Sequence, residues 1–262
     1  MSRIDFAGEA AARHVEETYL TPDVVAQRAR TLSALALRPG ERVVDIGSGP
    51  GLLAHDMARL VGPSGRVAGL DPSPAMNAMA ARRCADCPQA SFEAGEATAL
   101  PFAAASFDAA VTTQVLEYVA DIPLALAEIA RVLRPGGRVL IIDTAWDSVV
   151  VETSDRARNA RVWAAWEGHL VHPNLPTRLA PDLGAAGFET VRIETIPMVS
   201  VGWQPTSYAG RMIDAVAGYA AGAGRLAPGE AEAWRAELAA LSEAGRFYFS
   251  VDRVLFLAVR RG

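Results

Sequence analysis

The sequence contains no lysine: all 25 of its basic residues are arginines, and 30 acidic residues give a formal net charge of −5. Its basic residues form no dense cluster, because Arg82-Arg83 and Arg260-Arg261 are isolated pairs. A protein that binds nucleic acid needs a basic surface to neutralise phosphates. We therefore expect no nucleic-acid partner. The arginine-only, alanine-rich composition is typical of a GC-rich coding genome.

Long apolar runs are also missing. The longest of them, such as Val139–Ile142 and Val254–Val259, are far shorter than the roughly 20 residues that cross a bilayer as a helix. The first residues, Met1–Asp5, do not form the apolar core of a signal peptide. We therefore expect a cytoplasmic protein that has no membrane partner.

Cysteine is scarce, and the two cysteines, Cys84 and Cys87, have C-x-x-C spacing. This spacing occurs in redox pairs and in half of a zinc site. A zinc site needs two more ligands, and no second Cys/His pair stands at the usual spacing. A redox pair of the thioredoxin type would follow the first strand of a βαβ unit, whereas this pair follows a helical pattern. We expect two reduced thiols and no metal.

Apolar runs alternate with amphipathic segments along most of the 262 residues. This alternation predicts a parallel sheet wrapped by helices. The expected strands cover residues 42–46, 66–70, 90–94, 107–113, 138–143, 189–195 and 247–259. The expected helices cover residues 9–19, 22–37, 52–61, 74–83, 122–132, 178–186, 206–221 and 228–244. We predict one domain overall, with a helical lead-in (1–40), a ligand-binding core (41–143) and the rest of the sheet (144–262) carrying helical insertions at 144–176 and 198–246.

The most informative segment is the glycine-rich stretch between the first strand and the next helix, Val43-Val44-Asp45-Ile46-Gly47-Ser48-Gly49-Pro50-Gly51-Leu52. Its glycines allow a sharp turn in which the backbone lies close to a ligand. The helix that follows offers unpaired N–H groups at its first turn. Ligands of open α/β sheets bind at such strand ends. The segment therefore predicts a ligand site.

A nicotinamide-dependent dehydrogenase would share this plan, but its fingerprint is G-x-G-x-x-G. Here Leu52 stands where that pattern needs its third glycine, and Pro50 removes one backbone donor that would face a pyrophosphate. Asp45 adds a negative charge just before the loop. These features favour a ligand with a carboxylate and an amine over a dinucleotide.

The run D-I-G-S-G-P-G at 45–51 resembles motif I of class I S-adenosylmethionine-dependent methyltransferases, and further segments match in the expected order. The nearest similarity is to the small-molecule branch of ubiquinone and menaquinone biosynthesis. The further matching segments are Gly69–Ser73, Gly95–Ala97, Leu100–Phe102, Ser106–Asp108 and Arg131–Gly137. The resemblance implies a Rossmann-like, seven-stranded, mostly parallel sheet with helices on both faces and helical lid insertions. It also implies S-adenosylmethionine as cofactor and S-adenosylhomocysteine as product.

The same resemblance implies roles for individual residues toward this cofactor. Asp71 would accept hydrogen bonds from the ribose hydroxyls, Tyr19 would cover the methionyl end, and Gln114 would lie near the methionyl amine. Glu96 departs from the family, which usually has aspartate there, so a backbone contact from Ala97 is the alternative. The full implied set is Tyr19, Asp45, Gly47, Ser48, Gly49, Gly51, Asp71, Pro72, Met76, Gly95, Glu96, Ala97 and Gln114.

A general base matters for methyl transfer only when the acceptor atom must lose a proton. His169 and His172 are candidates because imidazole titrates near neutrality, and Glu117 is a further candidate at a strand end. Asp143 and Asp147 are alternatives near the same edge. Tyr118 stands where many relatives have histidine, and its phenol is a poor base at neutral pH.

The two predicted insertions are rich in aromatic residues, which favours an apolar or aromatic acceptor; the alternative is that these rings fill a helix–helix core. The rings are Trp146, Trp163, Trp166, Trp203, Tyr208 and Tyr219. The predicted activity is methyl transfer to a carbon or oxygen atom of a quinone, polyketide, prenyl or phenol metabolite. Two alternatives are a protein that binds the cofactor without transferring methyl groups, cyclase-like or regulatory, and a small-molecule N-methyltransferase. A homodimer is compatible with the sequence.

Overall fold

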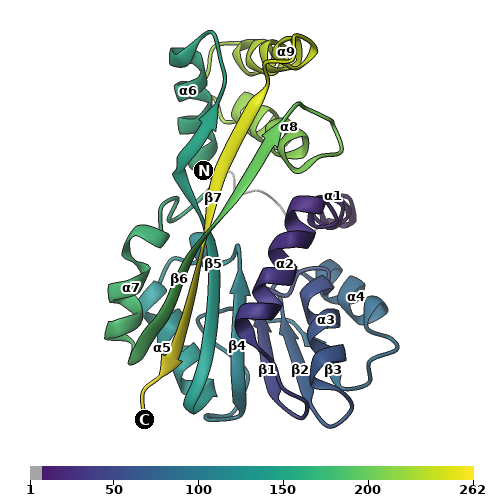
Figure 1. The fold of residues 1–262 in the computed structure, drawn as a ribbon, viewed down its shortest axis with the longest axis vertical. Helices are drawn as coiled ribbons and strands as arrows, with labels where there is room; N and C mark the ends of the chain where they lie inside the picture. Colours follow the sequence, from purple (N-terminus) through teal and green to yellow (C-terminus); the bar gives the residue numbers. More distant parts are fainter. Residues whose placement is uncertain (1–7) are drawn as a thin grey trace.

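A twisted sheet forms the centre of the molecule (Figure 1). The computed structural model describes residues 8–262, so Met1–Asp5 lie outside the described residues. Within this range seven strands have the order β3-β2-β1-β4-β5-β7-β6. They are β1 (Arg42–Ile46), β2 (Arg66–Leu70), β3 (Ala90–Glu93), β4 (Phe107–Thr113), β5 (Leu133–Val151), β6 (Phe188–Val201) and β7 (Tyr248–Arg260). Strands β1 to β5 pair in parallel, and β7 runs antiparallel to β5 and β6. The predicted seven-stranded, mostly parallel sheet is confirmed.

Helices cover both faces of this sheet, as the fold class requires. Residues of α2 (Pro22–Leu35) and α3 (Leu52–Val61), together with the two cysteines that follow α4 (Pro74–Arg83), share one buried cluster with one face. Residues of α5 (Ile122–Val132) and α7 (Pro176–Ala185) share another cluster with the opposite face. The helix α1 (Glu9–Tyr19) precedes them, and a short 3-10 turn, η1 (Leu116–Tyr118), follows β4.

The burial of the central strands explains their composition. In β1 the four residues after Arg42 are all buried, which is the pattern of a parallel strand covered on both faces. In α5 the buried positions Ile122, Ala125, Leu126 and Ile129 recur at helical spacing, so one apolar stripe faces the sheet. Sequence periodicity therefore located these elements to within a few residues.

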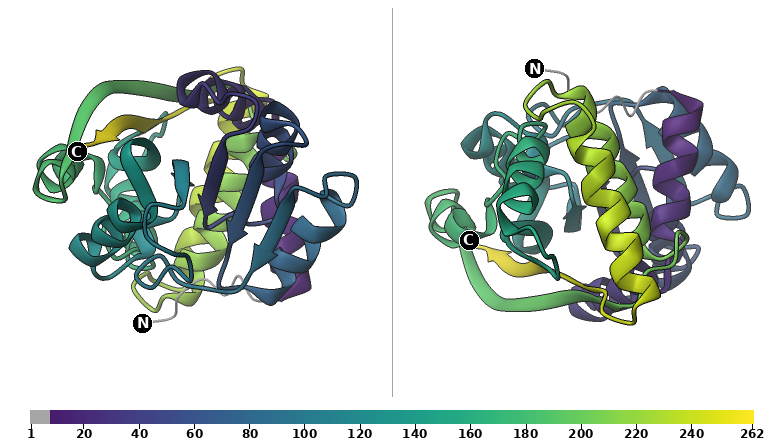
Figure 2. Two further views of the ribbon diagram at one scale, coloured as in Figure 1. Left: turned by 90° about the horizontal axis from the view of Figure 1, so that it is seen from below. Right: turned by 90° about the horizontal axis from the view of Figure 1, so that it is seen from above.

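Three strands continue beyond the layered core and carry a separate group of helices. The fifth strand was expected to end at Asp143 and the sixth at Thr195, but β5 runs to Val151 and β6 to Val201. Their ends pack with α6 (Arg156–Glu167), α8 (Tyr208–Gly222) and α9 (Glu230–Glu243) in a third buried cluster. Figure 2 shows α8 and α9 side by side across the upper end of the sheet. The first residues of both predicted insertions are therefore strand.

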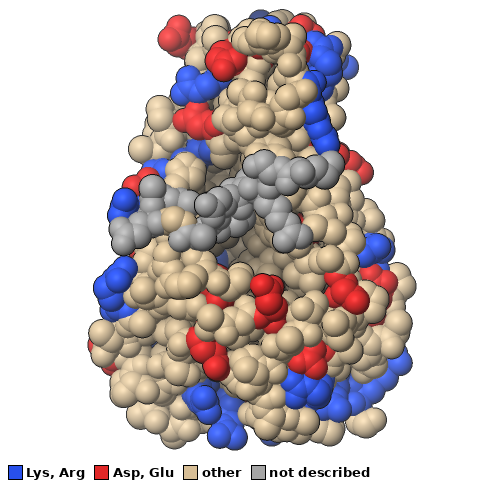
Figure 3. Space-filling model, turned by 180° about the vertical axis from the view of Figure 1, so that it is seen from behind, with Lys and Arg blue, Asp and Glu red and all other residues tan. Residues whose placement is uncertain are grey.

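Acidic and basic side chains are interspersed over the face shown in Figure 3. None of the helices within residues 8–262 has the length and apolar composition that a membrane span requires.

Candidate functional site

The glycine loop 47–51 folds back against β2 directly after β1. The amides of Gly47 and Ser48 both donate to the carbonyl oxygen of Leu70, at 2.7 and 3.0 Å. Gly47 has a φ of +72°, and a Cβ there would lie 2.2 Å from a methyl carbon of Val115. Only glycine fits this position, because both the backbone angle and the close approach exclude a side chain. At Gly49, in contrast, an added Cβ would point into open space.

The carboxylate of Asp71 ties the loop to the end of β2. One oxygen accepts from the amide of Gly49 at 3.0 Å, and the other accepts from the amide of Ser73 at 2.8 Å. Burial raises the pKa of Asp71, and these two amides act in the opposite direction. Each carboxylate oxygen keeps a further acceptor position, since an ionised carboxylate offers about four.

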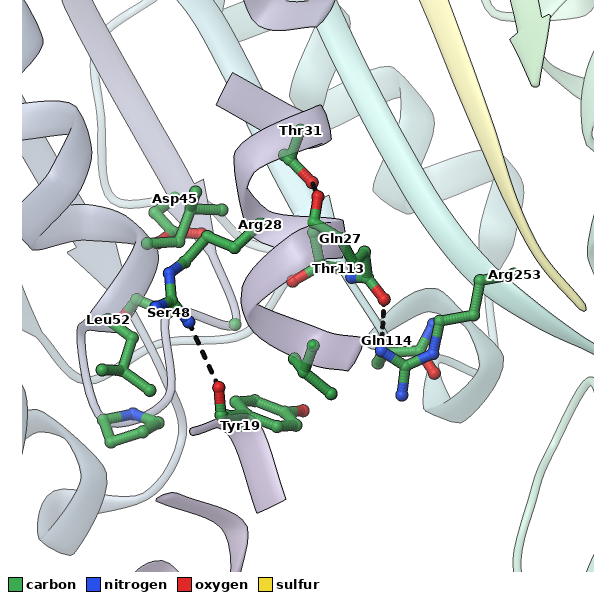
Figure 4. A pocket seen from close by; sticks show the side chains of 14 residues that line it. Tyr19, Gln27, Arg28, Thr31, Asp45, Ser48, Leu52, Thr113, Gln114 and Arg253 are labelled. Atoms are coloured by element: carbon green, nitrogen blue, oxygen red, sulfur yellow. Dashed lines mark hydrogen bonds between the residues drawn. The ribbon is translucent and has the colours of Figure 1, made fainter. Parts of the chain in front are cut away.

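A pocket opens between this loop, α2, the end of β4 and β7 (Figure 4). Five residues of the expected cofactor set line it: Tyr19, Asp45, Gly47, Ser48 and Gln114. The other members do not appear in its lining. They belong to the loop itself or follow the neighbouring strands β2 and β3: Gly49, Gly51, Asp71, Pro72, Met76, Gly95, Glu96 and Ala97.

Two polar side chains of β1 and the glycine loop line the pocket with buried atoms that have no hydrogen-bond partner among the described residues. They are Asp45, through Oδ2, and Ser48, through Oγ. Burial raises the pKa of Asp45 to about 7, and the nearby charge of Asp71 adds to the effect. Buried polar atoms are normally paired, so these two point to a polar ligand group. The amine and hydroxyl groups of S-adenosylmethionine fit such donors and acceptors.

Gln114 holds an unusual backbone conformation at the end of β4. Its φ is +57°, which is rare for a residue other than glycine. Its amide donates to the carbonyl oxygen of Ile142 at 2.7 Å, and its side-chain oxygen accepts from the hydroxyl of Thr144 at 2.5 Å. Strained conformations held by such contacts concentrate at functional sites.

Glu117, an expected base, is buried in η1 with 1% of its surface exposed. Its carboxylate accepts from the indole N–H of Trp146 at 2.9 Å, and its carbonyl oxygen accepts from the amide of His172 at 2.9 Å. Burial raises the pKa of Glu117 to about 7, against the indole hydrogen bond and the charge of Arg253. Asp143 is buried nearby, and burial followed by the charge of Glu117 raises its pKa well above the usual range.

His169 lies next to Tyr118 rather than next to Glu117. Its Nε2 is 3.4 Å from the hydroxyl oxygen of Tyr118, and its Nδ1 contacts the carbonyl oxygen of Trp166. Burial lowers the pKa of His169, so the ring is neutral at neutral pH. His172 reaches the same region through its backbone, while its Nε2 is buried without a partner among the described residues. The structure thus brings the three expected bases to one region, linked by η1.

Most rings of the two predicted insertions pack against one another. Trp146 lies 6.2 Å from Trp163 and 5.7 Å from Trp166, measured between ring centroids. Trp166 also contacts Tyr219 at 5.8 Å. These rings belong to the cluster under α6, α8 and α9, so the alternative of an ordinary packed core holds for much of their surface. The indole nitrogens of Trp163 and Trp166 are nevertheless buried without partners among the described residues.

The sequence did not single out several residues of the pocket. Arg253 and Gln27 are both buried and both line it, and Arg28 and Thr31 contribute from α2. One signal was present in the sequence of β7: Arg253 stands at a position where the alternating pattern of the strand expects a buried apolar residue. The helix α2 gave no such signal, because its polar residues resemble those of any surface helix.

The two cysteines are free and buried. Burial raises the pKa of Cys84 to about 11 and also raises that of Cys87. Both thiols therefore stay protonated at neutral pH. Ligand-type atoms of His55, Asp86 and Cys87 lie within 4.8 Å of one another, a grouping that spacing along the chain did not reveal.

Comparison with known proteins bears directly on the glycine loop and the strands around it. Residues 44–141 match the family model described as a methyltransferase domain. The core of this chain is a methyltransferase domain. The resemblance seen in the motifs is thereby confirmed, and the matched residues extend from β1 into β5.

Relatives of this methyltransferase domain include quinone-modifying enzymes. A transposon-borne 37.1 kDa protein of Streptomyces fradiae is 45% identical over 124 residues, which is 47% of this chain and 36% of that protein. A 2-phytyl-1,4-naphthoquinone methyltransferase of Synechococcus elongatus is 41% identical over 41% of this chain and 48% of its own length. A demethylmenaquinone methyltransferase of Beutenbergia cavernae is 41% identical over 44% of this chain and 46% of its own length. The chain spans about half the length, or less, of these curated relatives.

Solved structures share the fold of this methyltransferase domain at low identity. A [4+2]-cyclase has a TM-score of 0.59 at 22% identity, covering 91% of this chain and 81% of that one. A phosphoethanolamine N-methyltransferase of Haemonchus contortus, solved with S-adenosylmethionine, has a TM-score of 0.64 at 19% identity, covering 99% of this chain and 59% of that one. These similarities establish the fold alone.

Proposed function

We propose that this chain transfers a methyl group from S-adenosylmethionine to a carbon or oxygen atom of a small, largely apolar or aromatic metabolite of quinone, polyketide, prenyl or phenol type. The observation that carries the proposal is the pair of unpartnered polar atoms, on Asp45 and Ser48, beside the glycine loop. The similarity to a naphthoquinone methyltransferase and a demethylmenaquinone methyltransferase supports an aromatic acceptor.

Different residues would bind different parts of the cofactor. Asp71 has acceptor positions left for the ribose hydroxyls, while it anchors Gly49. Asp45 and Gln114 line the pocket on the side of β1 and β4, where they would meet the methionyl group, and Tyr19 lines it at the end of α1. When bound, S-adenosylmethionine supplies a methyl group on a positively charged sulfur, and an acceptor atom displaces that sulfur in line.

A group that accepts a proton from the methyl acceptor must itself be deprotonated near neutral pH, as a neutral imidazole or an ionised carboxylate is. The pKa of Glu117, raised by burial to about 7, suits this role. His169 is kept neutral by burial and contacts Tyr118 through Nε2. We assign proton acceptance to Glu117 or His169, and we assign to His172 the backbone contact that holds η1 in place.

The proposal is tested by incubating the protein with S-adenosylmethionine and reduced 2-phytyl-1,4-naphthoquinone, a phenol or an amine. Mass spectrometry then measures S-adenosylhomocysteine and the methylated acceptor. The expected result is methylation of the quinol or the phenol, at carbon or oxygen. Methylation of the amine alone would favour the N-methyltransferase alternative. Cofactor binding without turnover of any acceptor would favour a cyclase-like or regulatory protein and contradict the proposal.

A further inference from the structure

Arg253 is a buried cation in the wall of the pocket. It lies on β7 in the inward row with Val251 and Leu255, and only 3% of its surface is exposed. In Figure 4 its guanidinium extends toward Gln27 and Gln114, inside the ring of residues that line the pocket. Charged side chains are rarely buried to this extent without an opposite charge.

The partners of this guanidinium carry no charge. One terminal nitrogen donates to the side-chain oxygen of Gln27, and the other donates to the hydroxyl of Tyr208 at 3.2 Å. The ring of Tyr208 lies under the guanidinium, 5.0 Å from its central carbon to the ring centroid. Within residues 8–262 no carboxylate oxygen lies within 4.0 Å of the nitrogens of Arg253, although such ion pairs are frequent elsewhere in the chain.

Donors of Arg253 remain available for a ligand. A guanidinium has five N–H groups, and the Nε atom here is buried without a partner among the described residues. An Nε–H beside a terminal N–H forms the planar fork that matches the two oxygens of a carboxylate. The unused part of Arg253 is therefore a site for a planar anion.

The two buried carboxyl groups on which the charge of Arg253 acts do not supply that anion. Glu117 accepts from the indole of Trp146, and Asp143 accepts from the amide of Val115 at 3.1 Å. Burial raises the pKa of both, which weakens them as opposite charges for Arg253. A buried charge without an ionic partner is costly, so a bound anion would recover free energy.

The position of Arg253 relates it to the acceptor rather than to the cofactor loop. In the sheet Arg253 pairs with Thr144, whose hydroxyl binds the side chain of Gln114. On its other side the ring of Tyr208 lies 6.2 Å from that of Phe249 in the aromatic cluster. Arg253 thus lies between the expected methionyl end of the cofactor and the aromatic cluster.

We propose that Arg253 binds a carboxylate on the acceptor, so that the acceptor class is an apolar aromatic acid. This inference rests on the proposed function, because it names the substrate class of the same site. Arg253 is here a specificity-determining residue: its fork orients the acid, while the apolar part of the acceptor lies toward the aromatic cluster.

The test uses two probes of nearly the same shape, 1-hydroxy-2-naphthoate and 1-hydroxy-2-naphthamide, in which a neutral amide replaces the carboxylate. Each is titrated calorimetrically into the protein after saturation with S-adenosylhomocysteine. We expect the wild type to bind the carboxylate about ten- to a hundredfold more tightly than the amide, as for loss of a charged hydrogen-bonded pair. Arg253→Gln should abolish this preference and leave amide affinity within about threefold. Arg253→Lys, which keeps the charge but not the fork, should retain part of it.

The control variant is Arg235→Gln, which removes a half-exposed arginine paired with Asp214 and should keep the full preference. Equal wild-type affinity for both probes, or failure to bind the carboxylate, would overturn the inference, even if Arg253→Gln does not fold. A preference that survives in folded Arg253→Gln would also overturn it. Failure of S-adenosylhomocysteine to bind in the first step would instead contradict the proposed function.

Discussion

At the scale of single residues, buried polar groups mark the candidate site. Buried polar or charged side chains lie on α2, on η1, in the glycine loop and on β1, β4, β5 and β7: Gln27, Asp45, Ser48, Thr112, Glu117, Asp143, Thr144 and Arg253. Four of them, Gln27, Asp45, Ser48 and Arg253, line the pocket. Burying such groups costs stability unless a ligand or a partner compensates. Titration of these carboxyl groups should therefore appear in the stability of the protein.

Asp45 gives the clearest such effect. Its pKa is about 7 in the folded protein, against 3.8 as its ordinary value. The folded state therefore holds a proton that the unfolded state releases, and stability falls as pH rises from about 4 to 7. Asp45→Asn should remove on the order of 3 kcal/mol of this fall. Denaturant unfolding at a series of pH values measures it.

Glu117 shares the direction of this effect, so a smaller slope should remain in Asp45→Asn. The double variant Asp45→Asn with Glu117→Gln should flatten the profile further. An unchanged slope in Asp45→Asn would show that Asp45 is ionised in the folded protein and would refute the assignment.

The residues of the site were predictable from sequence where a motif fixes the backbone. The glycine loop and Asp71 are such cases, because backbone angle and strand order determine their neighbours. Arg253 and Gln27 were not predictable, since α2 and β7 lie near opposite ends of the chain and come into contact only in the folded protein. Likewise, the contact between Tyr118 and His169 joins segments far apart in the chain.

At the scale of elements, the loop after β1 is held by close packing against η1. A Cβ on Gly47 would overlap Val115, the residue before η1. Gly47→Ala should cost about 1–2 kcal/mol for the left-handed backbone and about 1–3 kcal/mol more for the overlap. Denaturant unfolding measures the loss.

Gly229→Ala is the matched control, because Gly229 has a φ of +78° and open space around its Cβ side. Gly229→Ala should lower the free energy of unfolding only by the cost of the left-handed backbone. Adding Val115→Ala to Gly47→Ala should restore the part of the unfolding free energy that the overlap with Val115 removes, and a double-mutant cycle isolates that part. Equal losses in the two glycine variants would mean that Val115 does not constrain the loop.

Element boundaries show where sequence patterns stop being informative. The fifth strand was expected to end at Asp143, where the apolar run ends, yet β5 continues to Val151. Its last part is held by β7, as in the pairing of Val151 with Phe249. A strand end that depends on a partner from the end of the chain leaves no local signal.

At the scale of the whole molecule, the layered core and the helices above it place the loop, the buried carboxyls and the aromatic cluster around one region. The class of the sheet, seven-stranded and mostly parallel, was predicted correctly, whereas its strand order was not predicted. The packing of α6, α8 and α9 over the extended strands depends on side-chain fit, and the sequence showed only that helices were present there.

We propose that the glycine loop and Asp71 bind S-adenosylmethionine. The most direct measurement is calorimetric titration with S-adenosylmethionine, S-adenosylhomocysteine and NADH, on the wild type, on Asp71→Ala and on the surface control Asp214→Ala. We expect both sulfur compounds to bind the wild type and the control, with NADH inert. Asp71→Ala should lose about a hundredfold in affinity, because two ribose hydrogen bonds and the anchor of Gly49 disappear. Binding of NADH instead, or undiminished affinity in Asp71→Ala, would contradict the account.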